Sequence, residues 1–228
     1  MQFKQLISNK NTELLKWIAI ISMTIDHIVK FGNIYVNDVT YILGRLAFPL
    51  FVIILSFNYE NNTRSKEKYI FRLLVFSIIS QGVFGMFGFG FIPFTEGFRG
   101  NIFITLSLGL LIYNSYEKNN IFYMFVFSIM SLFLNVDYGI FGIAFIISIL
   151  MKNIYLTYLT YFLSEFIVIS NYNELIYISI IIPLLIILLC CISFALNINI
   201  KRGPKYFFYI YYPLHLFIIG MIFFWFWV

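Results

Sequence analysis

Five ionisable side chains lie within long apolar stretches of the sequence: Asp26, His27, Arg45, Glu165 and His215. On membrane-insertion scales a charge at the centre of a span costs roughly 2.5–3.5 kcal/mol, so such residues are functional candidates. A neutral imidazole accepts a proton from an amine or a hydroxyl near physiological pH, as group transfer to that acceptor requires. His27 is therefore a candidate general base.

Asp26 and Arg45 are expected to form an ion pair. They approach a similar depth from opposite ends of one short loop, and pairing offsets part of the desolvation that each charge suffers alone. Adjacent helical residues diverge by about 100°, so Asp26 and His27 face different directions, whereas Ser22 and Asp26 share a face. The alternative reading is an interhelical clamp beside two buried, neutral histidines, His27 and His215.

The composition that surrounds these residues is typical of a membrane protein. The chain has 228 residues, of which 61% are hydrophobic and 11% charged, and its mean hydropathy is +0.91. Runs of about 20 apolar residues, enough to cross the hydrocarbon core of a bilayer, recur from end to end. The polar stretch 58–68 is too short for a globular domain, so residues 1–228 are predicted to form a single transmembrane domain.

Apolar runs and polar breaks predict an all-α fold with about nine membrane-spanning helices, and eight or ten are the alternatives. The predicted helices cover residues 14–31, 38–57, 69–90, 101–116, 121–135, 138–151, 153–170, 174–196 and 205–227. Asn119 and Asn120 are the expected caps of the fifth helix and Asn173 of the eighth, and Pro213 is expected to kink the last one. The glycine-rich residues 82–90 suggest close helix packing or a kink.

The distribution of Lys and Arg predicts the orientation, because basic residues stay on the cytoplasmic side. With the N-terminus in the cytoplasm, only Lys30 and Arg99 fall in outside loops, and Arg45 lies within a span. The other twelve of the 15 basic residues lie inside: Lys4, Lys10, Lys16, Arg64, Lys66, Lys68, Arg72, Lys118, Lys152, Lys201, Arg202 and Lys205. We expect a multi-pass protein of a bacterial cytoplasmic membrane.

Several classes of protein are disfavoured. The net charge of +5 comes from residues that flank the membrane, so nucleic acid is not an expected partner. Cys190 and Cys191 are adjacent, with no further cysteine for a disulfide framework. Neither histidine has a second ligand at metal-binding spacing, so no metal site is predicted.

Two basic clusters on the cytoplasmic side have the chemistry to bind the phosphates of a nucleotide-bearing donor. One comprises Arg64, Lys66, Lys68 and Arg72, and the other Lys201, Arg202 and Lys205. Membrane orientation alone also predicts both clusters.

Blocks along nearly the whole chain resemble the TraX family of membrane proteins, in order. They are residues 15–28 (LKWIAIISMTIDHI), 44–51 (GRLAFPLF), 63–74 (TRSKEKYIFRLL), 101–109 (NIFITLSLG), 137–142 (DYGIFG) and 201–215 (KRGPKYFFYIYYPLH). The family is named for a conjugation protein that N-acetylates pilin, and it is similar to transmembrane acyltransferases that use acetyl-CoA and an intramembrane histidine.

The resemblance implies acetyl transfer from cytoplasmic acetyl-CoA to a protein N-terminus or an envelope glycan. It makes His27 the catalytic candidate, with Asp26 and Arg45 in support. The residues expected to contact the donor or the developing oxyanion are Lys201, Arg202, Lys205, Arg64, Arg72, Asn101, Tyr209 and His215.

One departure from the family pattern concerns the acceptor. After the third helix the family tends to carry Ser-Glu-x-Pro-Phe-Asp, whereas this chain has Ser80-Gln81-Gly-Val-Phe84-Gly85. Both acidic positions are lost, which predicts a different acceptor or a missing contact. The rival functions are a proton-coupled transporter or channel, and a noncatalytic membrane partner of an envelope protein.

Overall fold

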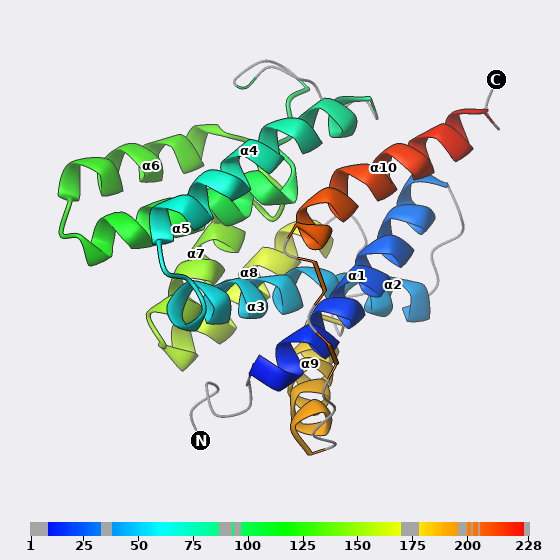
Figure 1. Cartoon of the computed structure of the whole chain (residues 1–228), viewed down its shortest axis with the longest axis horizontal. Helices are drawn as coiled ribbons and strands as arrows, with labels where there is room; N and C mark the ends of the chain where they lie inside the picture. The colour runs from blue at the N-terminus through cyan, green and yellow to red at the C-terminus, as the bar shows by residue number, and fades with distance from the viewer. Residues whose placement is uncertain are drawn as a thin grey trace. The chain divides into compact units, whose positions relative to one another are not determined.

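The computed structural model describes residues 9–32, 38–86, 93, 97–169, 178–195, 200–201, 203–204 and 206–225, and this part is helical (Figure 1). The helices are α1 (Asn9–Phe31), α2 (Asp38–Arg45), α3 (Ala47–Asn61), α4 (Lys66–Gly85), α5 (Ile102–Glu117), α6 (Ile121–Phe133), α7 (Gly139–Leu150), α8 (Ile154–Ile169), α9 (Ile178–Ala195) and α10 (Phe207–Trp225). The extended pairing within these residues is one isolated bridge between Gly100 and Val136. Asn173, an expected helix cap, lies outside the described residues.

The all-α prediction is confirmed, and each predicted span has a helical counterpart, with α2 and α3 together replacing the span at 38–57. The number of helices that cross a membrane stays a prediction. Contacts divide the chain into two compact units. The first unit holds α1, α2, α3 and α9, the second holds α4 to α8, and α10 contributes residues to both. That residues 1–228 form a single domain stays a prediction.

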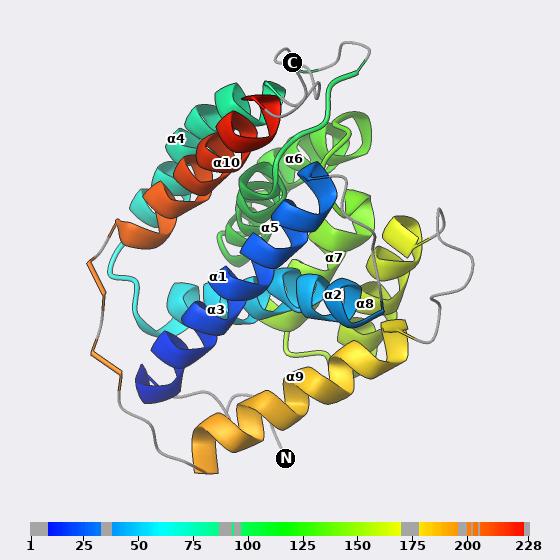
Figure 2. The same cartoon turned by 90° about the vertical axis from the view of Figure 1, so that its right-hand side faces the viewer.

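In the first unit α1 contacts α2, α3 and α9 (Figure 2). The sequence predicted one helix where α2 and α3 meet, but the structure separates them at Leu46. Pro49 is the physical reason, because it has no N–H to donate to the carbonyl of Arg45 four residues earlier, and its ring crowds that carbonyl. The break places Arg45 at the C-terminal end of α2.

In the second unit α5 contacts α4, α6 and α7, and α7 contacts α8. Gly109 on α5 permits the approach to α7, because a Cβ there would lie 2.9 Å from three side-chain atoms of Ile146. Of the glycine-rich stretch 82–90, residues 87–90 lie outside the described residues; at Gly82 the packing is open, since a Cβ added there meets nothing within 4 Å. A buried cluster completes this unit; it comprises Phe98, Leu108, Ile112, Leu134, Val136 and Ile143.

Polar residues set several helix ends. Asn120 caps α6 as predicted, its side-chain oxygen accepting a hydrogen bond from Tyr123 N at 3.1 Å. Helix α4 begins three residues earlier than predicted, because the Ser65 hydroxyl accepts from Lys68 N at 3.3 Å. Proline does not end α10, which continues through Pro213 to its last turn.

Within the described residues, two helical stretches are long and apolar enough to cross a membrane by length and composition: Val39–Asn61, which runs through α2, the break at Leu46 and α3, and Lys66–Gly85. Other apolar helices are shorter, and α6 and α7 have 13 and 12 residues. At 1.5 Å per residue these two helices are about 20 Å and 18 Å long, less than the roughly 30 Å core of a bilayer.

Candidate functional site

The predicted ion pair between Asp26 and Arg45 is present in the first unit. An Nη2–H of Arg45 donates to Oδ1 of Asp26, and the two side chains are 8% and 21% exposed. The guanidinium also lies 5.4 Å from the centre of the Tyr41 ring, on the preceding turn of α2. A largely buried cation and anion from two helices therefore meet as the sequence predicted.

Two further residues bring α1 and α2 together at this pair. The buried Ser22 hydroxyl donates to the carbonyl of Leu43 and lies 3.3 Å from the carbonyl of Gly44. A Cβ at Gly44 would lie 2.7 Å from Asp26 Oδ1 and 3.2 Å from Asp26 Cα. Ser22 thus uses the face that it shares with Asp26, and Gly44 leaves the space that the carboxylate occupies.

His27 follows Asp26 on α1 and is buried, with 9% of its surface exposed. Its ring lies 5.5 Å from that of Phe31 on the next turn, with an interplanar angle of 40°. The Asp26 carboxylate binds Arg45, as expected from the different directions of neighbouring helical side chains. The imidazole therefore has an apolar neighbour on one side and a buried ion pair on the adjacent residue.

A second polar cluster, which sequence reasoning missed, joins α4 to α5 in the second unit. Asn101 is fully buried, and its Nδ2 donates to the Ser77 carbonyl at 2.8 Å and to Gln81 Oε1 at 2.9 Å. Its Oδ1 accepts from Phe103 N at 3.0 Å and caps α5. Gln81 Oε1 also accepts from Asn101 N, and its Nε2 donates to the Arg99 carbonyl, both at 3.0 Å.

Gln81, the first of the two positions at which the resemblance predicts an acidic residue, acts as donor and acceptor at once. An ionised carboxylate has no N–H for the Arg99 carbonyl. The neighbouring loop is fixed by an ion pair from Arg99 to Asp137 at 2.9 Å and by a hydrogen bond from Thr105 Oγ1 to the Asp137 carbonyl at 2.8 Å. Both N–H groups of the Asn101 side chain form hydrogen bonds within the protein. The contact of Asn101 with the acyl donor or the developing oxyanion stays a prediction.

Replacing Asn101 with Ala is expected to destabilise the protein by about 2–3 kcal/mol, because the helix cap is lost and a buried carbonyl loses its donor. The Asn120→Ala variant is the matched control, since it removes an exposed cap that makes one side-chain hydrogen bond to Tyr123 N. Thermal unfolding of the two purified variants in detergent tests this. An equal effect of both substitutions would show that the buried contacts of Asn101 add nothing.

The sequence-predicted residues on α10 lie in an aromatic cluster of the second unit. The Tyr209 ring lies 5.2 Å from that of Phe76 and 6.2 Å from that of Phe103. His215 is buried, its ring is stacked 5.0 Å from that of Tyr211, and its Nδ1 donates to the Tyr211 carbonyl at 2.9 Å. His215 thus has the hydrogen bond of a satisfied core histidine. Its contact with the acyl donor or the developing oxyanion stays a prediction.

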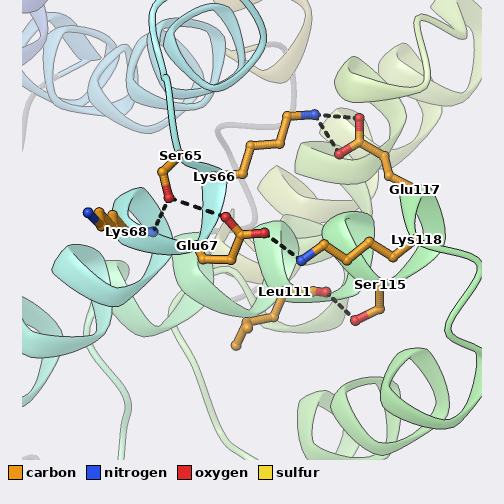
Figure 3. Close-up of polar contacts among 8 residues, drawn as sticks. All are labelled: Ser65, Lys66, Glu67, Lys68, Leu111, Ser115, Glu117 and Lys118. Atoms are coloured by element: carbon orange, nitrogen blue, oxygen red, sulfur yellow. Dashed lines mark hydrogen bonds and ion pairs between the residues drawn. The ribbon is translucent and has the colours of Figure 1, made fainter.

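The first basic cluster is partly occupied by ion pairs between α4 and α5. Figure 3 shows the side chain of Lys66 pointing toward Glu117 and that of Lys118 pointing toward Glu67. The Lys66 Nζ lies 2.7 Å from each carboxylate oxygen of Glu117, and the Lys118 Nζ lies 2.5 Å from Glu67 Oε1. We call these two crossed pairs the ionic clasp. It uses Lys66, which the sequence counted among the phosphate-binding candidates.

Other cations of the two basic clusters remain candidates for binding the phosphates of the acyl donor. Arg64 is exposed, whereas Arg72 is half-buried and donates from Nε to the Lys68 carbonyl at 3.2 Å. Lys201 is exposed in the first unit, and Arg202 and Lys205 lie outside the described residues. Within the described ranges no group of three or more His, Cys, Asp or Glu side chains could hold a metal ion.

Comparison with known proteins gives one family. The family model described as TraX protein matches residues 11–223, nearly the whole chain. No curated protein and no solved structure matches the chain. The match includes most of α1, the Asp26–Arg45 pair, the Asn101 cluster and most of α10. Apolar helices and this match together indicate a membrane protein, and the chain belongs to the TraX family.

Proposed function

We propose that this protein is a multi-pass acyltransferase of a bacterial cytoplasmic membrane that moves acetyl from acetyl-CoA to an amine or hydroxyl acceptor. The acceptor class is a protein N-terminus, such as that of a pilin, or an envelope glycan. The observation that carries the proposal is a buried Asp26–Arg45 pair adjacent to a buried imidazole, His27, in a chain of the TraX family.

The surface of α9 supports placement in lipid. Ile180, Leu184, Leu188 and Ile192 are 60%, 62%, 53% and 43% exposed and recur every four residues. The other face of α9 packs inward through Ile182, Ile186 and Cys190. A helix that is apolar on both faces, with one face exposed, fits contact with acyl chains better than contact with water.

The chemistry assigned to His27 is general base catalysis. Its neutral imidazole removes the proton from the acceptor nitrogen or oxygen, which attacks the thioester carbonyl carbon and forms a tetrahedral oxyanion. The carbon–sulfur bond then breaks, and the imidazolium returns the proton to the CoA thiolate. Arg45 is assigned to stabilise the oxyanion, while Asp26 stabilises the Arg45 charge in an apolar environment.

Phosphate recognition is assigned to exposed cations in each unit separately. Arg64→Ala and Lys201→Ala are each expected to raise the KM for acetyl-CoA about tenfold, with kcat within about twofold, because each loses a charge-assisted hydrogen bond to phosphate. Lys118→Ala is the matched control, since Glu67 holds its ammonium group. Initial rates over a range of acetyl-CoA concentrations test this; an unchanged KM in both variants would assign these cations to membrane orientation alone.

Purified protein incubated with labelled acetyl-CoA and bacterial membrane extract tests the function itself. Time-dependent release of CoA thiol, with label recovered in a peptide, glycan or lipid, is the expected result and identifies the acceptor class. The absence of both signals from protein that is folded in detergent would overturn the proposal. Transport of solute by reconstituted protein without CoA release would instead favour a transporter.

A further inference from the structure

Three contacts in consecutive turns fix the register of α1 against α2. Ser22 binds the carbonyls of Leu43 and Gly44, and one turn later on α1 Asp26 binds Arg45. At Gly44, any side chain larger than hydrogen would collide with the Asp26 carboxylate. The contacting residues on α2 are therefore successive, and each meets the same face of α1.

The Ser22 contact addresses a general need of helix ends. The last carbonyls of a helix lack donors in a following turn, and Pro49 cannot supply one to Arg45. Inside a bilayer no water replaces a missing donor. The Ser22 hydroxyl, 4% exposed, donates to the Leu43 carbonyl and lies 3.3 Å from the Gly44 carbonyl, and so it holds the backbone from which the guanidinium extends.

The close approach of Gly44 is to the Asp26 carboxylate oxygen that binds Arg45. An added Cβ would lie 2.7 Å from the same Asp26 oxygen that accepts from Arg45, and 3.0 Å from Asp26 Cβ. Contacts below 3.0 Å do not persist, so either the carboxylate or the helix must shift. A shift of α1 at Asp26 also moves His27, the next residue.

We propose that Ser22 and Gly44 are positioning residues of the candidate site, which hold the Asp26–Arg45 pair in register and thereby orient the His27 imidazole. The inference rests on the proposed acyl transfer for its kinetic consequences. Its structural content, the coupling of Ser22 and Gly44 to the ion pair, stands on the contacts themselves.

The kinetic test compares Ser22→Ala, Ser22→Thr and Gly44→Ala. The two alanine variants are expected to lower kcat about tenfold or more with KM for acetyl-CoA within about twofold, because small displacements of catalytic groups are costly. Ser22→Thr keeps a hydroxyl and is expected to restore most of kcat. Matched controls are Ser107→Ala, which removes a buried hydroxyl with no hydrogen-bond partner, and Gly82→Ala, which adds a Cβ in open space.

A thermal-unfolding cycle tests the coupling without any reference to activity. Ser22→Ala is expected to lower Tm by about 2–4 °C in the wild-type background and by less than about 1 °C when Arg45 is already Gln, because its effect passes through the pair. Equal effects in the two backgrounds would overturn the positioning role. Wild-type protein without transfer activity would overturn the proposed function, while the cycle would still decide whether Ser22 and Arg45 are coupled.

Discussion

Replacing His27 with Ala is expected to lower acetyl transfer by at least about 100-fold while the protein remains folded. A positioned general base contributes roughly 10²–10⁴-fold to such a reaction, and alanine has no group to accept the proton. The imidazole makes its ring contact with Phe31, one turn away on α1. The initial rate of CoA release at saturating acetyl-CoA, with size-exclusion chromatography in detergent to verify folding, measures the effect.

A glutamine at this position separates basicity from polarity. His27→Gln keeps a polar side chain of similar length but cannot take up a proton, so it is expected to be as inactive as the alanine variant. Added imidazole is expected to restore part of the rate in His27→Ala, whose side-chain space is vacated, and none in His27→Gln. A fully active alanine variant would remove His27 from the proposed chemistry.

Removing one member of the ion pair is expected to cost about 3 kcal/mol of folding stability. In Arg45→Gln the Asp26 carboxyl group is left in a largely buried position without its cation, and in Asp26→Asn the guanidinium is left without its anion. Either substitution is also expected to abolish detectable transfer. Chemical or thermal unfolding in detergent, compared with the rate of CoA release, gives both quantities.

A double variant distinguishes a clamp from a catalytic support. Asp26→Leu combined with Arg45→Met replaces both charges by apolar groups, and buried ion pairs replaced in this way often lose little or no stability. We expect near-native stability and no transfer. Transfer at the native rate would assign the pair to an interhelical clamp, the alternative that the residue types left open.

Much of the fold followed from the sequence because helices in an apolar chain are marked by long runs and short polar breaks. Asp26 and Arg45 could be paired in advance because both are charges in apolar surroundings close to one short loop, and desolvation favours their meeting. The cap at Asn120 was predictable because its side chain is local to the helix that it starts.

Other features depend on contacts that sequence periodicity does not contain. The break at Leu46 follows from Pro49, which lies within an otherwise continuous apolar run. Gly44 is a generic helix residue until its distance to Asp26 is known. The role of Gln81 depends on Asn101, 20 residues away, and on a loop carbonyl that only the folded backbone presents.

The chemistry of the site remains a proposal because residue type and burial restrict it without identifying a substrate. His215 shows why: a buried histidine on α10 has the same appearance in a sequence whether it faces a ligand or its own helix. Its Nδ1 in fact donates to the Tyr211 carbonyl one turn earlier. Such local hydrogen bonds are set by side-chain rotation, which a sequence pattern does not specify.

The α4–α5 hairpin carries a fastening at each end, the ionic clasp at its open end and the amide contacts of Asn101 at the end where the two helices are connected. Two apolar helices in lipid gain little from water exclusion and so have little to stop them sliding along each other. Contacts at both ends of the hairpin restrain this sliding. Substitutions in the middle of the hairpin that preserve both fastenings should therefore leave unchanged which residues its two ends bring together.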